Sequence, residues 1–464
     1  MTSETLTRYR FPAADGALWL GLRLAPIATI ASALTLTVLA LYAGAPLPAG
    51  VATLTVGVVA ATVPVADRTV VEWTPLALRR LVNRATGQTR WVTGALPCAP
   101  AKEAVAVPVR LPASGVRLRL LEVDGIGVVD DPRARQRTVV LAVAGSDRFP
   151  MIEPLEQHRL LAAWGNALTG LAADTRVRRV QWIERAAPED RDPAAWLDAR
   201  VPANAEPTAV ADYRQLAASI ASAAFRHDVW LAVAFDRDPD VDALPAAATQ
   251  VTAGLLAAQL SARPLSLAET AELLRRGLDG TANAGAVTVQ QVAALSHQLG
   301  WESLRTDDCW HRAFAVTGWP RLPVHTGWLE PLLVAAPPQA VRTVSVHLRP
   351  VAAQVAMRQA RATRARARLD AADRSRLGLL DSPRLDVDQA DAAAAEEELV
   401  AGYRLHHVAA SITVSAGSAE QLNGAARAIR TAAQTARLEL RPLHGQHQHG
   451  LVSSLPLCRP DGAR

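Results

Sequence analysis

Two adjacent runs of opposite charge are the most unusual chemical feature of this chain. Residues 357–376 contain seven arginines and two aspartates, whereas residues 381–398 contain seven carboxylates and one arginine. Gly378 separates the two runs, so we expect a basic helix and an acidic helix that can pair antiparallel. The candidate residues for pairing or for docking a partner are Arg358, Arg361, Arg364, Arg368, Glu396, Glu397 and Glu398.

Three uses of these charges remain open: pairing within the chain, docking of a partner protein, and binding of nucleic acid. Pairing within the chain is the simplest, because each run can neutralise its neighbour. Nucleic acid is the least favoured partner, because no aromatic residues interleave with the arginines to stack on bases. We therefore expect direct contact with nucleic acid to be absent.

Histidines near the end of the chain could bind a divalent metal ion. His444, His447 and His449 lie close together, but no cysteine or carboxylate accompanies them, which favours a polar turn. His406 and His407 begin an expected strand and would point to opposite faces of a sheet. The sequence therefore predicts no metal site.

Motifs for nucleotide binding and covalent catalysis are incomplete. Lys102 is the only lysine, and no glycines surround it, which excludes a phosphate-binding loop with its essential lysine. Gly125 and Gly127 lack the third glycine of a dinucleotide-binding loop. Gly145-Ser146-Asp147 lacks the following glycine of a nucleophile elbow. We therefore expect a protein that is not an enzyme and holds no cofactor.

Composition places the chain among folded proteins of more than one domain. Its 464 residues carry a net charge of +5, half are apolar and one fifth are charged, which argues against extensive disorder. Cys98, Cys309 and Cys458 are too scattered for a disulfide framework. We expect all three to be reduced thiols in a cytosolic compartment.

Two uncharged runs near the beginning predict a membrane anchor. Residues 24–43 and 47–66 are each 20 residues long, the length of a transmembrane helix. Arginines flank the pair while the turn between them is uncharged, which predicts that both termini and the main body are cytoplasmic. The flanking arginines are Arg8, Arg10 and Arg23 before the first run and Arg68, Arg79, Arg80, Arg84 and Arg90 after the second.

Beyond this anchor, strand and helix patterns alternate. Apolar residues alternate with arginines over 116–120, and helical spacing follows over 160–171. The pattern predicts an α+β fold with βαβ or ferredoxin-like units and a charged helical hairpin over about 352–400. The expected divisions are a membrane anchor (1–90), a first α/β unit (91–240), a mainly helical segment (241–310) and a second α/β unit (311–464).

Several segments resemble known components of conjugation systems. The polar start Arg8-Tyr9-Arg10-Phe11-Pro12 and the two apolar runs resemble PrgI-type membrane subunits of type IV secretion systems. The body resembles the N-terminal, non-motor domain of TraE/TrsE-class conjugation ATPases, and an actinobacterial family of integral membrane proteins joins both parts. The segments that carry this second likeness are Trp310-His311-Arg312-Ala313-Phe314, Gly318-Trp319-Pro320-Arg321, Thr343-Val344-Ser345-Val346, Gly445-Gln446-His447-Gln448 and Ser454-Leu455-Pro456-Leu457.

The resemblance implies a non-enzymatic inner-membrane subunit of a type IV-like secretion or conjugation apparatus. In this interpretation the chain is a docking platform for a separate ATPase, because none of the nucleotide-binding residues of that class has a counterpart here. The implied partners are that ATPase, other membrane subunits and further copies of this chain in an oligomer. Two alternatives stay open: a type VII secretion membrane component, and a membrane-anchored enzyme with an unrecognised site.

Overall fold

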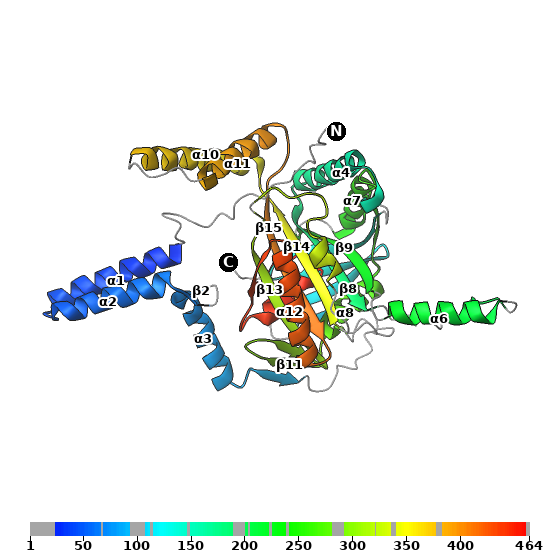
Figure 1. Cartoon of the computed structure of the whole chain (residues 1–464), viewed down its shortest axis with the longest axis horizontal. Coiled ribbons are helices and arrows are strands. Elements are labelled where there is room, and N and C mark those ends of the chain that lie inside the picture. Colours follow the sequence, from blue (N-terminus) through cyan, green and yellow to red (C-terminus); the bar gives the residue numbers. More distant parts are fainter. Residues whose placement is uncertain are drawn as a thin grey trace. The chain divides into compact units, whose positions relative to one another are not determined.

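The computed structural model forms two compact units, one over Ala13–Trp91 and one that includes Val92–Arg464 (Figure 1). Arg8, Arg10, Arg23, Cys98 and Lys102 lie outside the described residues. The described residues are 24–65, 68–92, 107–111, 115–145, 149–188, 200–202, 205–221, 225–237, 241–280, 292–320, 322–335, 340–376 and 383–460.

Helices dominate the unit that ends at Trp91. Helices α1 and α2 pack against each other at a close approach, because a Cβ atom on Gly57 would lie 2.2 Å from the Cβ atom of Ala33. Only glycine allows this spacing. The elements are α1 (Leu24–Tyr42), α2 (Leu47–Thr62), the strands β1 (Pro64–Val65) and β2 (Arg68–Thr69), and α3 (Val70–Ala85).

The predicted transmembrane hairpin is wrong. Helix α2 ends at Thr62 rather than at residue 66, since Pro64 disfavours helical geometry in the residue before it. Its 16 residues measure about 24 Å, less than the roughly 30 Å hydrocarbon core of a bilayer. Among the described residues, no helix combines the length and apolar character needed to cross a membrane. The prediction that the chain is a two-span membrane protein is therefore wrong as well.

In the larger unit, the expected α+β class is confirmed by a mixed structure with one large, mainly antiparallel sheet. Its first half has the strand order β10-β7-β9-β8, in which all neighbours are antiparallel. Three shorter antiparallel strands, β4, β5 and β6, extend this half along β7. The strands are β4 (Val107–Arg110), β5 (Arg117–Val123), β6 (Ile126–Asp131), β7 (Gln136–Ala144), β8 (Val177–Pro188), β9 (Phe225–Asp236) and β10 (Ser261–Pro264).

The second half repeats this arrangement in the same chain order. Its strand order is β16-β13-β15-β14, and a short hairpin extends it along the first long strand. The strands are β11 (Ser296–Leu299), β12 (Leu304–Thr306), β13 (Cys309–Gly318), β14 (Ala340–Pro350), β15 (His406–Ala416) and β16 (Glu439–Pro442). A short strand, β3 (Arg90–Val92), includes the position in the sequence at which the first unit ends and the larger unit continues.

Each half carries two helices on one face of the sheet and an inserted helical element between its second and third long strands. The covering helices are α4 (Pro154–Ala173) and α7 (Leu244–Leu256) in the first half, and α9 (Glu330–Val334) and α12 (Ala419–Thr435) in the second. The insertions are α6 (Pro207–Ala221) and the pair α10 (Ala353–Arg376) and α11 (Pro383–Val400). The charged hairpin thus occupies the same topological position as α6.

Strands β8 and β14 join the two halves through an antiparallel pairing that runs from Arg342–Ala186 to Leu348–Val180. On the helix-covered face, Trp182 packs against the hydrophobic cores of both halves. On the other face lie α8 (Leu267–Asp279), α13 (His447–Ser454) and the residues that follow α13. The sheet therefore runs without a break through both expected α/β units.

Candidate functional site: the charged hairpin

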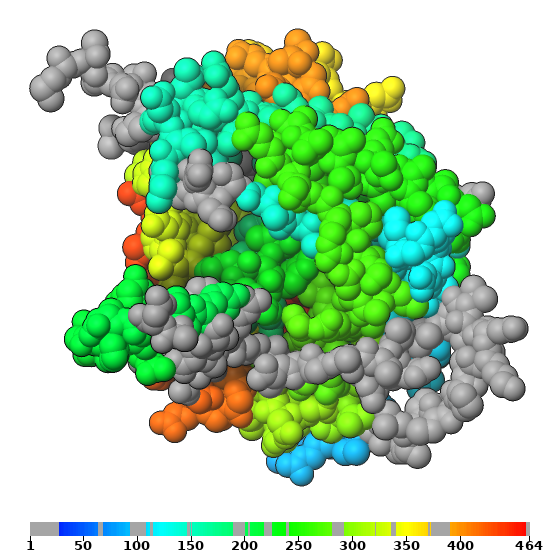
Figure 2. Space-filling model, turned by 90° about the vertical axis from the view of Figure 1, so that its right-hand side faces the viewer, coloured from blue at the N-terminus to red at the C-terminus, as the bar shows by residue number. Residues whose placement is uncertain are grey.

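Helices α10 and α11 form the hairpin that the charge pattern predicts, and they pack against each other (Figures 1 and 2). The buried residues of these two helices are alanines, because Ala356, Ala360 and Ala392 are buried while most of their neighbours are exposed. Alanine has the highest helix propensity and lets two helices approach closely. The hairpin therefore holds together with little apolar bulk, and its surface is left to charged side chains.

One carboxylate joins the two helices electrostatically. Glu396 Oε2 accepts a hydrogen bond from Arg364 Nη1 at 2.7 Å, and Glu396 Oε1 lies 3.6 Å from Arg361 Nε. The hydrogen bond from Arg364, assisted by its positive charge and that of Arg361, lowers the pKa of Glu396 below its usual value. This carboxylate therefore stays ionised and fixes the two helices relative to each other.

The other predicted residues do not take part in that contact. Arg358, Arg368, Glu397 and Glu398 are exposed, and within the described part of the chain none of them has a side-chain hydrogen bond or an ion pair. The structure thus brings together three of the seven candidates and leaves four facing outward. Outward charges of both signs make the hairpin a surface that can bind a charged partner.

A buried ion pair near the junction of the two halves gave no signal in the sequence. Arg342 on β14 is fully buried, and its Nη2 lies 2.5 Å from Glu184 Oε1 on β8. Its Nη1 donates to the carbonyl oxygens of Leu332 and Leu333 at the end of α9. Glu184 also contacts His227 Nδ1 at 2.7 Å. This arrangement ties both halves and α9 together.

A second buried polar group lies on the opposite face of the sheet. Gln181 Nε2 donates to Ser345 Oγ, Ser453 O and Leu455 O at 2.8 to 2.9 Å. His347 Nε2 lies 2.9 Å from Ser453 Oγ, and burial lowers the pKa of His347 to about 4. The serine and histidine are buried, so a substrate has no route to this pair. The group holds the end of α13 and Leu455, which follows it, against the sheet.

The predicted polar turn accounts for only part of the histidine cluster near residue 447, because His444 lies in a turn over residues 444–445 while His447 and His449 lie in a helix. Residues 447–454 form helix α13, and His447 is buried with its Nδ1 accepting from the amide of Ala313 at 3.2 Å. Burial lowers the pKa of His447 to about 3. His444 stacks on Trp301 instead, with ring centroids 6.0 Å apart. Within the described residues, no three metal-binding side chains gather in one place.

His311 belongs to another structural network. Thr306 Oγ1 donates to Leu278 O, so His311 Nε2 donates to Thr306 at 2.5 Å and its Nδ1 accepts from Ser415 Oγ at 2.8 Å. Burial lowers the pKa of His311 to about 4. Nearby, burial raises the pKa of the Cys309 thiol to about 12, which makes it a poor nucleophile. These groups hold α8 against the second half of the sheet.

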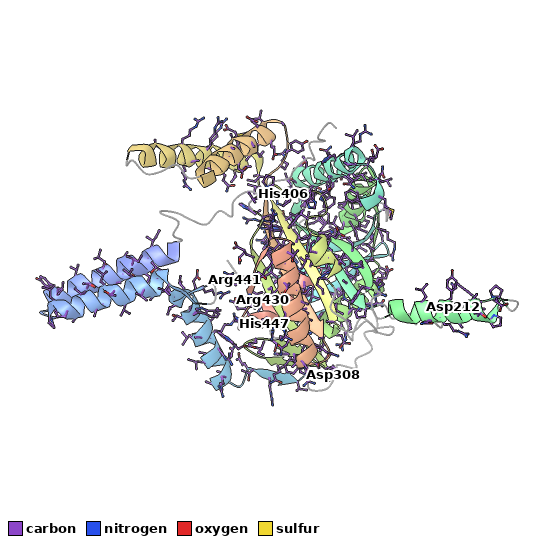
Figure 3. The ribbon with its side chains drawn as sticks, in the orientation of Figure 1. Asp212, Asp308, His406, Arg430, Arg441 and His447 are labelled. Atoms are coloured by element: carbon purple, nitrogen blue, oxygen red, sulfur yellow. The ribbon has the colours of Figure 1, made fainter. Side chains whose placement is uncertain are left out.

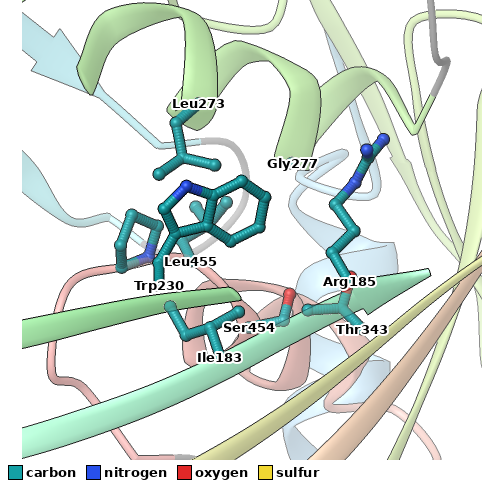
Figure 4. Close-up of a pocket in the computed structure, with 9 residues that line it drawn as sticks. Ile183, Arg185, Trp230, Leu273, Gly277, Thr343, Ser454 and Leu455 are labelled. Carbon is teal, nitrogen blue, oxygen red and sulfur yellow. The ribbon is translucent and has the colours of Figure 1, made fainter. Parts of the chain in front are cut away.

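Figure 4 shows a narrow hollow between α8, the sheet and the residues that follow α13. Its empty volume is about 300 Å³, which includes space open to solvent. Side chains such as Trp230, Leu273 and Leu455 make it mainly apolar, and Arg185 is its charged member. Arg185 is buried, so the hollow presents one cation in an apolar wall and no acid–base pair.

No protein-family model matches this chain, and a search of curated proteins gives no match. The function of the hairpin is therefore inferred from its own residues and from the sheet that carries it.

Proposed function

We propose that this chain is a non-enzymatic structural subunit of a type IV-like secretion or conjugation apparatus, in which it docks a separate ATPase. The observation that carries this proposal is the hairpin α10–α11, which projects from the sheet and holds four outward charges without described partners. Charges arranged on a rigid element steer and orient a protein partner.

The fold of the body also supports the proposal. We assign each half to the ferredoxin-like class on the basis of the strand orders β10-β7-β9-β8 and β16-β13-β15-β14. The segments that resemble the non-motor domain of conjugation ATPases lie in this body. Trp310–Phe314 is part of β13, and Thr343–Val346 is part of β14.

Co-purification with the ATPase partner tests the proposal. The tagged chain and a P-loop ATPase encoded beside its gene are produced together and isolated through the tag. We expect the ATPase to be retained by the native chain. The double variant Arg358→Glu with Arg368→Glu should lose it, because both side chains face outward and reversing them repels an acidic partner surface.

A matched control has the same change of charge elsewhere. Arg427 and Arg430 on α12 are also exposed, and the double variant Arg427→Glu with Arg430→Glu should retain the ATPase. Equal thermal melting of both double variants would establish that neither has unfolded. Loss of the ATPase from both variants, or from neither, would contradict docking on the hairpin.

A further inference from the structure

A basic surface lies at the end of the sheet from which the hairpin projects. Strands β7, β8 and β15 begin there, and β6, β9 and β14 end there, as the pairings Gln136–Asp236, Val180–Leu348 and Arg349–His407 fix. Figure 3 labels His406 at this end and Asp308 at the opposite end of the body. Helix α10 starts three residues after β14 ends, so the hairpin continues this surface.

Arginines predominate among the described residues of these strand ends. These ends hold ten arginines and only four aspartates, and Asp242 in the turn beyond β9 is a fifth carboxylate. We call these arginines the basic rim: Arg133, Arg135, Arg137, Arg176, Arg178, Arg179, Arg237, Arg349, Arg404 and Arg459. A net positive charge on a rigid edge attracts anions.

The aspartates of the strand ends are already engaged. Each forms an ion pair with a rim arginine, at nitrogen–oxygen distances from 2.5 to 3.1 Å, so none of them is available to neutralise the rest. The pairs are Arg237 with Asp130, Arg459 with Asp131, Arg176 with Asp174 and Arg178 with Asp236.

Two features show cations that an external anion would stabilise. Arg349 is exposed and Arg404 half-exposed, and neither side chain has an ion pair or a hydrogen bond among the described residues. At the same end, exposed Arg110 and Arg117 lie directly opposite each other in the pairing of β4 and β5. Like charges facing each other across a strand pair are destabilising, and a bound anion relieves the repulsion.

We infer that the basic rim, together with the start of α10, binds an acidic segment of the partner ATPase. This inference rests on the proposed function and names the chemistry of the partner surface. Arginine forks match carboxylates in bidentate geometry. A nucleic acid fits less well, because α10 has no aromatic side chains between its arginines on which bases could stack.

Fluorescence anisotropy with a labelled poly-L-glutamate peptide tests the inference on the full chain. We expect binding that weakens as salt increases. The variant Arg349→Glu with Arg404→Glu should bind roughly tenfold more weakly. The control Arg427→Glu with Arg430→Glu makes the same change of net charge away from the rim and should bind like the native chain.

Two outcomes would overturn the inference. The first is that the rim variant and the control variant bind poly-L-glutamate equally well, whether as tightly as the native chain or more weakly. The second is rim-dependent binding of a labelled DNA duplex that exceeds binding of poly-L-glutamate, which would make the rim a nucleic-acid surface. Retention of the ATPase is measured separately. If the native chain binds no poly-L-glutamate but the variant Arg358→Glu with Arg368→Glu still releases the ATPase, the inference about the rim is wrong and docking on the hairpin stands.

Discussion

Arg342 and Glu184 face each other across the junction of the two halves, with 2.5 Å between Nη2 and Oε1. Both side chains are buried, so each depends on the other for its charge to be tolerated. The pair lies between strands β14 and β8, the two strands through which the halves meet.

Removing one member of this pair should destabilise the protein strongly. The variant Arg342→Ala leaves Glu184 buried without its main cation, and we expect its free energy of unfolding to fall by about 3–5 kcal/mol. The double variant Arg342→Met with Glu184→Leu removes both charges and should recover most of that loss. Chemical denaturation of both variants measures this, and equal losses would show that the two charges are not coupled.

Reversing the charge of Glu396 should loosen the hairpin. The variant Glu396→Arg places a third cation beside Arg361 and Arg364, so the hairpin should melt earlier, and the difference should shrink at high salt. Adding Arg361→Glu and Arg364→Glu should restore part of the loss. Circular dichroism during heating, at low and high salt, provides the measurement. Identical melting of all three proteins would exclude pairing through Glu396.

Buried histidines should make the protein sensitive to acid. The pKa values of His311 and His347 are lowered to about 4, so between pH 6.5 and pH 4 the unfolded chain binds protons that the folded chain does not. Stability should therefore fall as the pH drops through this range, by about 1.4 kcal/mol for each pKa unit of difference at each residue. The variant His347→Gln should show a shallower decline in denaturation measured across this range.

Helix α13 should tolerate no side chain at Gly450. A Cβ atom at this position would lie 2.2 Å from the Cβ atom of Ala313, so the helix would have to move off the sheet. We expect Gly450→Ala to cost roughly 1–3 kcal/mol of unfolding free energy. Gly424→Ala on α12 is the matched control, because no atom lies within 4 Å of the added carbon. A native-like melting temperature for Gly450→Ala would contradict the close packing.

Purified protein should neither bind ATP tightly nor hydrolyse it. The expectation comes from the single lysine, Lys102, which has no surrounding glycines. Isothermal titration calorimetry and a phosphate-release assay are the measurements. Micromolar binding that a single substitution in the hollow, such as Arg185→Ala, abolishes would identify a nucleotide site of another type.

The sequence predicts the elements with strong periodicity and misses those whose formation depends on distant partners. The alternation around Val344 and the helical spacing around Leu422 correspond to β14 and α12. Strand β10 has four residues, too few for a pattern, and forms because it pairs with β7 more than 100 residues earlier. The second uncharged run predicts a helix that is too long, because that prediction depends on the absence of charge and does not take into account Pro64, which disfavours helical geometry in the residue before it.

For the candidate site, composition predicts the hairpin but not which charges pair within it. Arg361 and Arg364 reach Glu396 only through the way in which α10 and α11 are rotated against each other, which charge composition does not give. The basic rim has no local signature either. Its arginines come from several strands, and only the sheet pairings bring them to one end.

The contacts of residues 453–459 with earlier strands affect the order in which the protein folds during synthesis. Gln136 and Gln181 bind the carbonyl groups of Leu457 and Leu455, and Asp131 binds Arg459. Gln136, Gln181 and Asp131 precede their partners by more than 250 residues in the sequence, so they are synthesised well before those partners. During synthesis the first half can form its strands, but its polar groups must remain hydrated or be shielded until residues 453–459 have been made. Completion of these buried contacts is therefore delayed until residues 453–459 have left the ribosome.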